Sequence, residues 1–153
     1  IFKKNGFFFQ RRVGANNNKF IIIKIRSLST DNLEHPKKFG VFIRKYKLDE
    51  LPQFFNVLLG QMTIVGPRPE LENYFIKNNY PNSLLKTKPG ITGLASVYFI
   101  NESIIKNQCS DLDVYGNWMF LRKNKLNMIY LNNKSFCFKI KVIYITIQRI
   151  LIN

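Results

Sequence analysis

The sequence has 153 residues, with 24 lysines and arginines against 9 aspartates and glutamates, which gives a formal net charge of +15. A charge of this size favours anionic ligands, and phosphate is the obvious class. The 46% of hydrophobic residues can form the core of one ordinary domain, which excludes an intrinsically disordered chain. No run of 18 or more apolar residues occurs, so the sequence contains no candidate membrane-spanning helix.

The first elements predicted along the chain are two strands. Residues 7–12 and 19–27 are β-prone, and the letters VGANNN stand between them. Gly14 and the three asparagines after Ala15 can take the positive φ angles of a tight turn, so we predict a β-hairpin. A polar loop that ends at Pro36 is predicted to lead into a basic segment. His35 lies in this loop, where a lone histidine is typically an exposed surface residue.

The strongest helical pattern begins at Leu48 and ends at Gly60. Asp49 and Glu50 occupy its first turn, and Pro52 stands where a missing N–H costs nothing. The positive end of the helix dipole keeps at least one carboxylate ionised and available as a nucleophile or metal ligand. Since neighbouring helical residues point about 100° apart, the two carboxylates are expected to do different jobs. The alternative is a solvated first turn without chemistry.

A rigid corner follows. Pro67 and Pro69 lock φ on either side of Arg68, so the letters GPRP predict a turn of fixed geometry. Residues 70–79 are predicted to be helical, and residues 86–93, KTKPGITG, to be a loop with free backbone donors.

The second half of the chain is predicted to be mainly helical. Residues 94–99 suggest a strand, and residues 112–131 suggest one or two helices. The segment from Ser135 has an isoleucine and valine content that would allow a strand, but its length and interspersed basic residues favour an amphipathic helix. We therefore predict an α+β fold in a single domain, residues 1–153, with a β-hairpin followed by a mainly helical part that has amphipathic membrane-interface helices.

Two cysteines and two arginines complete the candidate chemistry. Cys109 and Cys137 lack metal-ligand spacing, so we interpret them as free thiols of a reducing compartment, with a disulfide as the alternative. Arg44 and Arg68 flank the acidic pair, and two cations there could grip a phosphorylated ligand while a carboxylate attacks phosphorus. Arginine's planar fork suits a diphosphate better than the point charge of lysine. The alternative for Arg68 is a buried structural pair with a nearby acid, Glu70 or Glu72.

The motifs LDELPQ and VGPRP are highly specific in this order, and KPGITGLAS follows them. Through these motifs the chain closely resembles the bacterial sugar transferases, the monotopic phosphoglycosyl transferases that begin the assembly of surface glycans. The resemblance covers most of the chain. The letters FFFQRRVG and KIRSL are similar to the opening hairpin of that family. Its closing pattern is similar at Tyr130, Asn133, Ser135, Lys141 and Thr146.

The resemblance implies a reaction in two displacements. Asp49 would attack the β-phosphorus of a UDP-sugar, expel UMP and carry a covalent phosphosugar. Polyprenol (undecaprenyl) phosphate would then attack this adduct and leave as polyprenol diphosphate sugar. Glu50 would assist as a base or as part of the metal environment. Mg²⁺ is the expected ion, with Asp49 as its protein ligand, because carboxylate and phosphate oxygens are its usual ligands.

The resemblance also implies substrate-binding residues in the basic segment, the proline corner and the KPGITG loop: Arg44, Pro67, Arg68, Pro69, Lys88 and Thr92. The family's matching arginine contacts a phosphate, and its corner helps to hold the nucleotide. For the KPGITG loop we expect contact with an anion, and a turn that only packs is the alternative.

Members of the family carry a hydrophobic membrane segment ahead of the hairpin, and this sequence begins almost at the hairpin. We therefore expect membrane binding through basic and apolar surface, above all residues 136–152, at the cytoplasmic face of the bacterial inner membrane. One alternative is an inactive remnant that acts as a membrane-surface protein, since Tyr46, Gln61 and Lys139 depart from the family pattern. Another is a basic nucleic-acid-binding module, which the scattered lysines disfavour, so no nucleic-acid partner is predicted. The transferred sugar and the oligomeric state are not specified.

Overall fold

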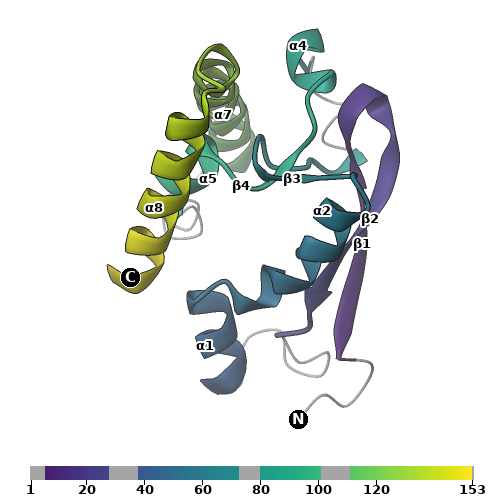
Figure 1. The fold of residues 1–153 in the computed structure, drawn as a ribbon, viewed down its shortest axis with the longest axis vertical. Helices are drawn as coiled ribbons and strands as arrows, with labels where there is room; N and C mark the ends of the chain where they lie inside the picture. Colours follow the sequence, from purple (N-terminus) through teal and green to yellow (C-terminus); the bar gives the residue numbers. More distant parts are fainter. Residues whose placement is uncertain (1–5, 28–37, 73–79, 101–110, 153) are drawn as a thin grey trace.

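The structure, a computed structural model, describes residues 6–27, 38–72, 80–100 and 111–152. Figure 1 shows a β-hairpin along one side, two long helices along the other and short elements between them. The fold is α+β, as predicted. His35 and Cys109 lie outside the described residues, as does most of the helix predicted for residues 70–79.

The predicted hairpin is confirmed. Strands β1 (Phe7–Val13) and β2 (Lys19–Ile25) pair antiparallel along their whole lengths. A short 3-10 turn, η1 (Ala15–Asn17), joins them, and Asn16 and Asn17 have φ angles of 54° and 62°. Asparagine tolerates this left-handed region better than most residues, so the asparagine run encodes the turn.

The acidic pair lies on a 3-10 helix rather than on the predicted α-helix. Helix η2 (Leu48–Gln53) continues into α2 (Phe54–Leu58), and Gly60, at φ 71°, ends the segment as predicted. An α-helix that begins at Leu48 would need a hydrogen bond from residue 52 to the carbonyl of residue 48, and Pro52 has no N–H. In the observed 3-10 helix the N–H of Glu50 donates to the carbonyl of Lys47 at 3.1 Å, and Pro52 donates no bond in this pattern either.

A small parallel sheet replaces part of a predicted loop. Strand β3 (Thr63–Val65) pairs with β4 (Gly90–Thr92), so the loop prediction for KTKPGITG is wrong at β4. Its backbone donors are not all free, because the N–H of Gly90 donates to the carbonyl of Pro67 at 2.7 Å. Glycine permits this approach, since a Cβ on Gly90 would lie 2.1 Å from the nitrogen of Gly66. The pairing therefore ties the KPGITG segment to the proline corner.

Helix α5 (Leu94–Tyr98) stands where the sequence suggests a strand, so that prediction is wrong. A short apolar run cannot separate helix from strand by its periodicity. In the fold, α5 buries Ala95 and Val97 and packs against α7 (Leu112–Asn132) and α8 (Phe136–Ile152). Tertiary contacts with the two long helices therefore decide the conformation of this run.

The two long helices agree with their predictions. Helix α7 is a single helix, and α8 begins directly after Ser135, whose hydroxyl accepts a hydrogen bond from the N–H of Phe138 at 3.3 Å. Helix α8 is amphipathic and leaves large apolar side chains exposed: Phe136, Ile140, Tyr144, Ile147, Leu151 and Ile152. Helices α1 (Lys38–Lys45) and α4 (Asn82–Leu85) are the remaining described helices. Cys137, on α8, is an exposed free thiol.

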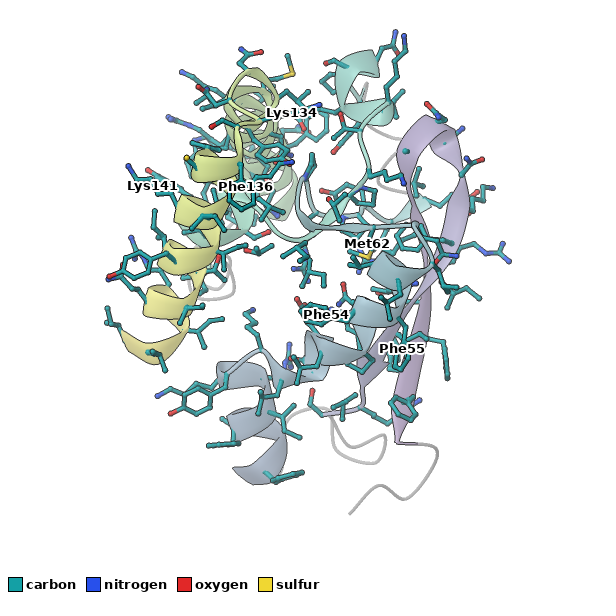
Figure 2. The ribbon with its side chains drawn as sticks, viewed as in Figure 1. Phe54, Phe55, Met62, Lys134, Phe136 and Lys141 are labelled. Atoms are coloured by element: carbon teal, nitrogen blue, oxygen red, sulfur yellow. The ribbon has the colours of Figure 1, made fainter. Side chains whose placement is uncertain are left out.

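The core consists of small clusters at the junctions between elements. Met62 lies between α2 and the hairpin, as Figure 2 shows, in a cluster with Phe20 and Ile22. A second cluster joins β3 and α5 to the long helices: Val65, Val97, Tyr130 and Val142. A third lies on α7 and the end of α5: Phe99, Tyr115 and Met119. Within the described ranges, no helix is long and apolar enough to cross a bilayer.

Gly90→Ala is expected to lower the free energy of unfolding by about 3 kcal/mol or more. The added Cβ would meet the backbone nitrogen of Gly66 at 2.1 Å and its Cα at 2.7 Å, and these atoms cannot move without separating β3 from β4. Urea unfolding followed by circular dichroism measures the change.

Gly116→Ala on α7 is the matched control, because a Cβ there meets nothing within 4 Å. Alanine replaces glycine within a helix in this variant, so the free energy of unfolding should rise by about 0.5–1 kcal/mol. If both variants unfold at the same urea concentration, the close approach of the two strands is incorrect.

Candidate active site

A cavity of about 650 Å³ lies between η2, the small parallel sheet, α5, α7 and α8. Part of its wall is charged: Arg44, Lys47, Glu50, Arg68 and Glu70. Another part is formed by isoleucines: Ile64, Ile91, Ile143, Ile147 and Ile150. A cavity with both kinds of wall suits a ligand that has an anionic part and an apolar part.

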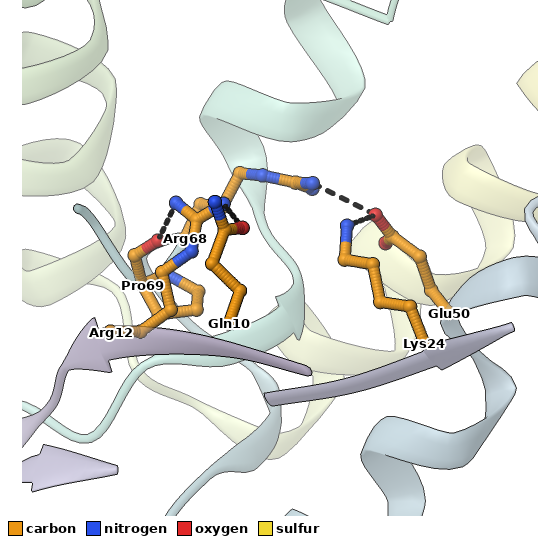
Figure 3. Close-up of polar contacts among 6 residues, drawn as sticks. All are labelled: Gln10, Arg12, Lys24, Glu50, Arg68 and Pro69. Atoms are coloured by element: carbon orange, nitrogen blue, oxygen red, sulfur yellow. Dashed lines mark hydrogen bonds and ion pairs between the residues drawn. The ribbon is translucent and has the colours of Figure 1, made fainter. Parts of the chain in front are cut away.

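A buried carboxylate joins three elements at the charged wall. One oxygen of Glu50, Oε1, accepts hydrogen bonds from Nζ of Lys24 at 2.9 Å and from Nη2 of Arg68 at 2.8 Å (Figure 3). Glu50 is 8% exposed and belongs to η2, Lys24 belongs to β2, and Arg68 belongs to the proline corner. The pairing of Arg68 across the cavity wall therefore links the LDELPQ motif to the VGPRP motif.

The two cations keep Glu50 ionised. Burial raises the pKa of this carboxyl group, but the charges and hydrogen bonds of Arg68 and Lys24 outweigh burial and lower the pKa to about 2. Burial also lowers the pKa of Lys24, which Glu50 partly offsets. At neutral pH Glu50 is therefore a carboxylate of very low basicity, which is poorly suited to accept a proton.

Asp49 has the opposite electrostatic environment. Burial raises its pKa, and the negative charge of Glu50 raises it further, against the opposing effects of Lys24, Lys47 and Arg44. Its Oδ1 is buried and has no hydrogen-bond partner within the described part of the chain. The cavity wall includes Glu50 but not Asp49, which lies directly beside it in η2. Asp49 thus has one enclosed carboxylate oxygen without a partner in the described part of the chain, next to the cavity wall in sequence but not part of it.

These residues fit Mg²⁺ only if the substrate supplies most of the oxygen ligands of the ion. No group of three or more histidines, cysteines, aspartates or glutamates forms a metal cage in the ranges that the structure describes. Mg²⁺ commonly binds to one or two carboxylates together with substrate phosphates. The unpartnered Oδ1 of Asp49 is an oxygen of that type.

The proline corner is fixed by hydrogen bonds that its carbonyl groups accept from neighbouring elements. Arg12 of β1 donates to the carbonyl of Pro69 at 3.0 Å and to Oε1 of Gln10 at 2.6 Å, as Figure 3 shows. The carbonyl of Pro67 accepts the N–H of Gly90. Both prolines line a small hollow separate from the main cavity. Of the three corner residues, only Arg68 lines the main cavity. The sequence did not indicate the supporting role of Arg12.

The other predicted binding residues divide into two groups. Arg44, at the end of α1, and Thr92, on β4, line the main cavity. The hydroxyl of Thr146 donates to the carbonyl of Val142, so Thr92 is the donor in the 2.8 Å hydrogen bond between the two threonines. This bond ties β4 to α8. Lys88 is exposed and is not part of the cavity wall.

Sequence reasoning missed several polar residues that the fold brings to the site, among them Lys24, Lys123 and Asn127. Lys24 follows Phe20 and Ile22 on the inward face of β2, so the strand alternation was a usable signal for a buried lysine. Lys123 and Asn127 of α7 line the main cavity. Their spacing of four residues places them on one face of the helix, but no motif marks them.

Glu50→Gln removes the charge of this side chain and keeps its size. The folded-state pKa of about 2 lies below the ordinary 4.5, so the carboxylate stabilises the fold above pH 4.5 and this contribution disappears as the pH falls toward 2. At pH 7 we expect the variant to lose at most about 3 kcal/mol of unfolding free energy, since the cost of burying Lys24 offsets part of the gain. Denaturant unfolding at pH 7 and at pH 3 measures both values.

Glu72→Gln is the control, because Glu72 pairs with Lys19 at the surface and such pairs contribute little. A loss in Glu50→Gln that is the same at pH 7 and at pH 3 would mean that the charge of Glu50 does not stabilise the fold.

Comparison with known proteins identifies the family of the chain. The family model for bacterial sugar transferases matches residues 2–153. The chain is 33% identical over 95% of its length to a galactosyl transferase, CpsE, of Streptococcus agalactiae serotype III. It is 32% identical over 94% of its length to a UDP-N-acetylgalactosamine-undecaprenyl-phosphate N-acetylgalactosaminephosphotransferase of Aeromonas hydrophila. It is also 32% identical over 95% of its length to a UDP-glucose:undecaprenyl-phosphate glucose-1-phosphate transferase of Klebsiella pneumoniae.

The chain covers 34%, 35% and 32% of these three relatives, so it spans about a third of their length. The matched third includes the hairpin, the acidic pair, the proline corner and both long helices. With a family match over almost the whole chain, and the two motifs joined at one cavity, this protein belongs to the bacterial sugar transferase family.

Proposed function

We propose that the chain is the catalytic part of a phosphoglycosyl transferase that moves a sugar-1-phosphate from a UDP-sugar to undecaprenyl phosphate. The observation that carries this proposal is the 2.8 Å contact between Glu50 and Arg68, which joins the two family motifs at the wall of the main cavity. The names of the relatives from Aeromonas hydrophila and Klebsiella pneumoniae describe this type of transfer. Such a reaction would begin the assembly of a surface polysaccharide.

The two kinds of cavity wall suit the two substrates. The guanidinium groups of Arg44 and Arg68 are well placed to bind phosphate oxygens of the nucleotide sugar and of the lipid phosphate. The isoleucines of the other part of the wall suit the isoprenoid chain of undecaprenyl phosphate. A cavity that was polar throughout would not favour the lipid.

In the first step, a carboxylate oxygen of Asp49 attacks the β-phosphorus, the bond to the bridging oxygen of UMP breaks, and UMP leaves. In the second step, an oxygen of undecaprenyl phosphate attacks the same phosphorus and restores the free carboxylate. The raised pKa makes Asp49 the more basic of the two acids. Mg²⁺ held by Asp49 and the diphosphate would neutralise charge on the phosphate oxygens.

Glu50 is assigned a positioning role. Its pKa of about 2 disfavours a role as general base at neutral pH. Its two ion pairs instead hold the side chains of Lys24 and Arg68 in place before substrate binds. Preorganised cations of this kind stabilise charge on a transferring phosphoryl group without reorganisation during the reaction.

We also propose that the protein associates with the cytoplasmic surface of the bacterial inner membrane. Exposed aromatic and aliphatic side chains of α8 alternate with Lys139, Lys141 and Arg149, which gives the helix both apolar and cationic surface. The α2 segment adds exposed Phe54 and Phe55, which Figure 2 labels. Such surfaces bind in the headgroup region of anionic membranes.

Asp49→Asn is expected to reduce UMP release by at least about 1000-fold, since no nucleophilic oxygen remains. The assay contains Mg²⁺, undecaprenyl phosphate and a panel of UDP-sugars, and mass spectrometry searches for a phosphosugar on the wild-type chain. The same variant should be more stable than wild type at pH 7. A raised pKa means that the charged form of Asp49 costs stability above that pKa, and the difference should vanish at low pH where the group is protonated.

Glu72→Gln, an acid-to-amide change at the surface, should retain wild-type UMP release. Equal rates for Asp49→Asn and wild type would refute the nucleophile assignment. A wild-type chain that releases no UMP from any UDP-sugar would refute the transferase itself.

A further inference from the structure

Asn127 is a buried polar residue on the inward face of α7. Tyr115, Met119 and Tyr130 are buried on this helix, and their spacing places Asn127 on the same inward stripe. Asn127 is only 4% exposed. An apolar side chain is the expected occupant of such a position, so the carboxamide requires a separate explanation.

No hydrogen bond joins the carboxamide of Asn127 to another side chain or to the backbone within the described residues, and its polar atoms are not among the fully enclosed ones. It lines the main cavity, together with Lys123 one turn earlier on α7 and Ser96 on α5. The carboxamide is therefore open to the cavity, where only water or a ligand can pair with it. A ligand that displaces this water without pairing would leave the amide unsatisfied, which is costly.

The chemistry of the group limits what that ligand can be. A carboxamide is neutral and has both a donor and an acceptor, so it pairs well with a hydroxyl group, which also has both. The anionic part of a nucleotide sugar is better matched by the arginines of the charged wall, Arg44 and Arg68. The neutral, hydroxyl-bearing parts of the same substrate are the hexose and the ribose, and comparison with UMP, which contains only the ribose, separates the two.

We propose, on the basis of the transferase function above, that Asn127 is a specificity-determining residue that hydrogen-bonds a hydroxyl group of the transferred sugar. Unpaired polar groups in a binding site discriminate strongly against substrates that cannot pair with them. Asn127 thus contributes to the choice among UDP-hexoses that differ in the orientation or substitution of one hydroxyl.

Asn127→Leu tests this role, because leucine has nearly the same size and no polar atoms. The kcat/KM for the preferred UDP-sugar should fall about tenfold, the loss expected for one neutral hydrogen bond. Hexoses that do not present the recognised hydroxyl should lose much less, so the ranking within a panel of UDP-glucose, UDP-galactose and their N-acetyl forms should change. Inhibition by UMP should stay unchanged, because UMP contains the ribose but not the transferred hexose.

The thermal stability of the ligand-free variant is an independent readout. The amide makes no hydrogen bond to the protein within the described residues, so Asn127→Leu should not lower the Tm of the ligand-free protein. A residue that holds the fold by its own hydrogen bonds would show a lower Tm on this change. Asn117→Leu is the matched control, since Asn117 is exposed on α7 and is not part of the cavity wall; it should alter neither sugar preference nor UMP inhibition.

Two outcomes would overturn the proposal while wild-type turnover still supports the transferase. Equal losses for all sugars with weaker inhibition by UMP would assign Asn127 to the nucleotide. Unchanged kcat/KM for every sugar would show that the carboxamide meets only water in the cavity. Absence of turnover in wild type would instead contradict the proposed function, and binding of UDP-sugars by calorimetry would then decide whether Asn127 contacts them.

Discussion

The site depends on one carboxylate oxygen, Oε1 of Glu50, which accepts hydrogen bonds from Lys24 and Arg68. A buried charge is stable only when it is paired, so the position of this oxygen determines where both cations must lie. The three residues come from the hairpin, the 3-10 helix and the proline corner, which are far apart in the chain. The ion pairs therefore assemble the charged wall of the cavity.

Backbone hydrogen bonds complete the support of this wall. The carbonyls of Pro67 and Pro69 accept hydrogen bonds from the N–H of Gly90 and the guanidinium of Arg12, so both have a partner within the protein. The corner is thereby fixed against both the hairpin and the small parallel sheet. The arginine between the prolines can then hold its guanidinium group in the cavity wall with little loss of entropy on binding, which is how a rigid scaffold contributes to affinity.

Two adjacent acids acquire different properties from their surroundings. Asp49 and Glu50 share one turn of η2, but burial raises the pKa of Asp49 while two cations lower that of Glu50 to about 2. Opposite shifts in neighbouring titratable groups commonly separate chemical roles in active sites. Here they distinguish a more basic carboxylate with an unpartnered oxygen from a carboxylate that organises cations. The same arrangement gives a reason for the order of the two acids in the motif.

The sequence by itself determined the elements whose signal is local. The asparagine run specified the hairpin turn, Gly60 specified the end of α2, and α8 followed from its length and amphipathic pattern. The family motifs identified Glu50 and Arg68 as members of one site. Only the tertiary structure decided the helix at residues 94–98 and the pairing of β3 with β4, because short apolar runs fit either conformation until their neighbours are known. It alone also brought in the residues that no motif marks, Lys24 and Asn127, since ion pairing and cavity exposure depend on which faces of distant elements meet.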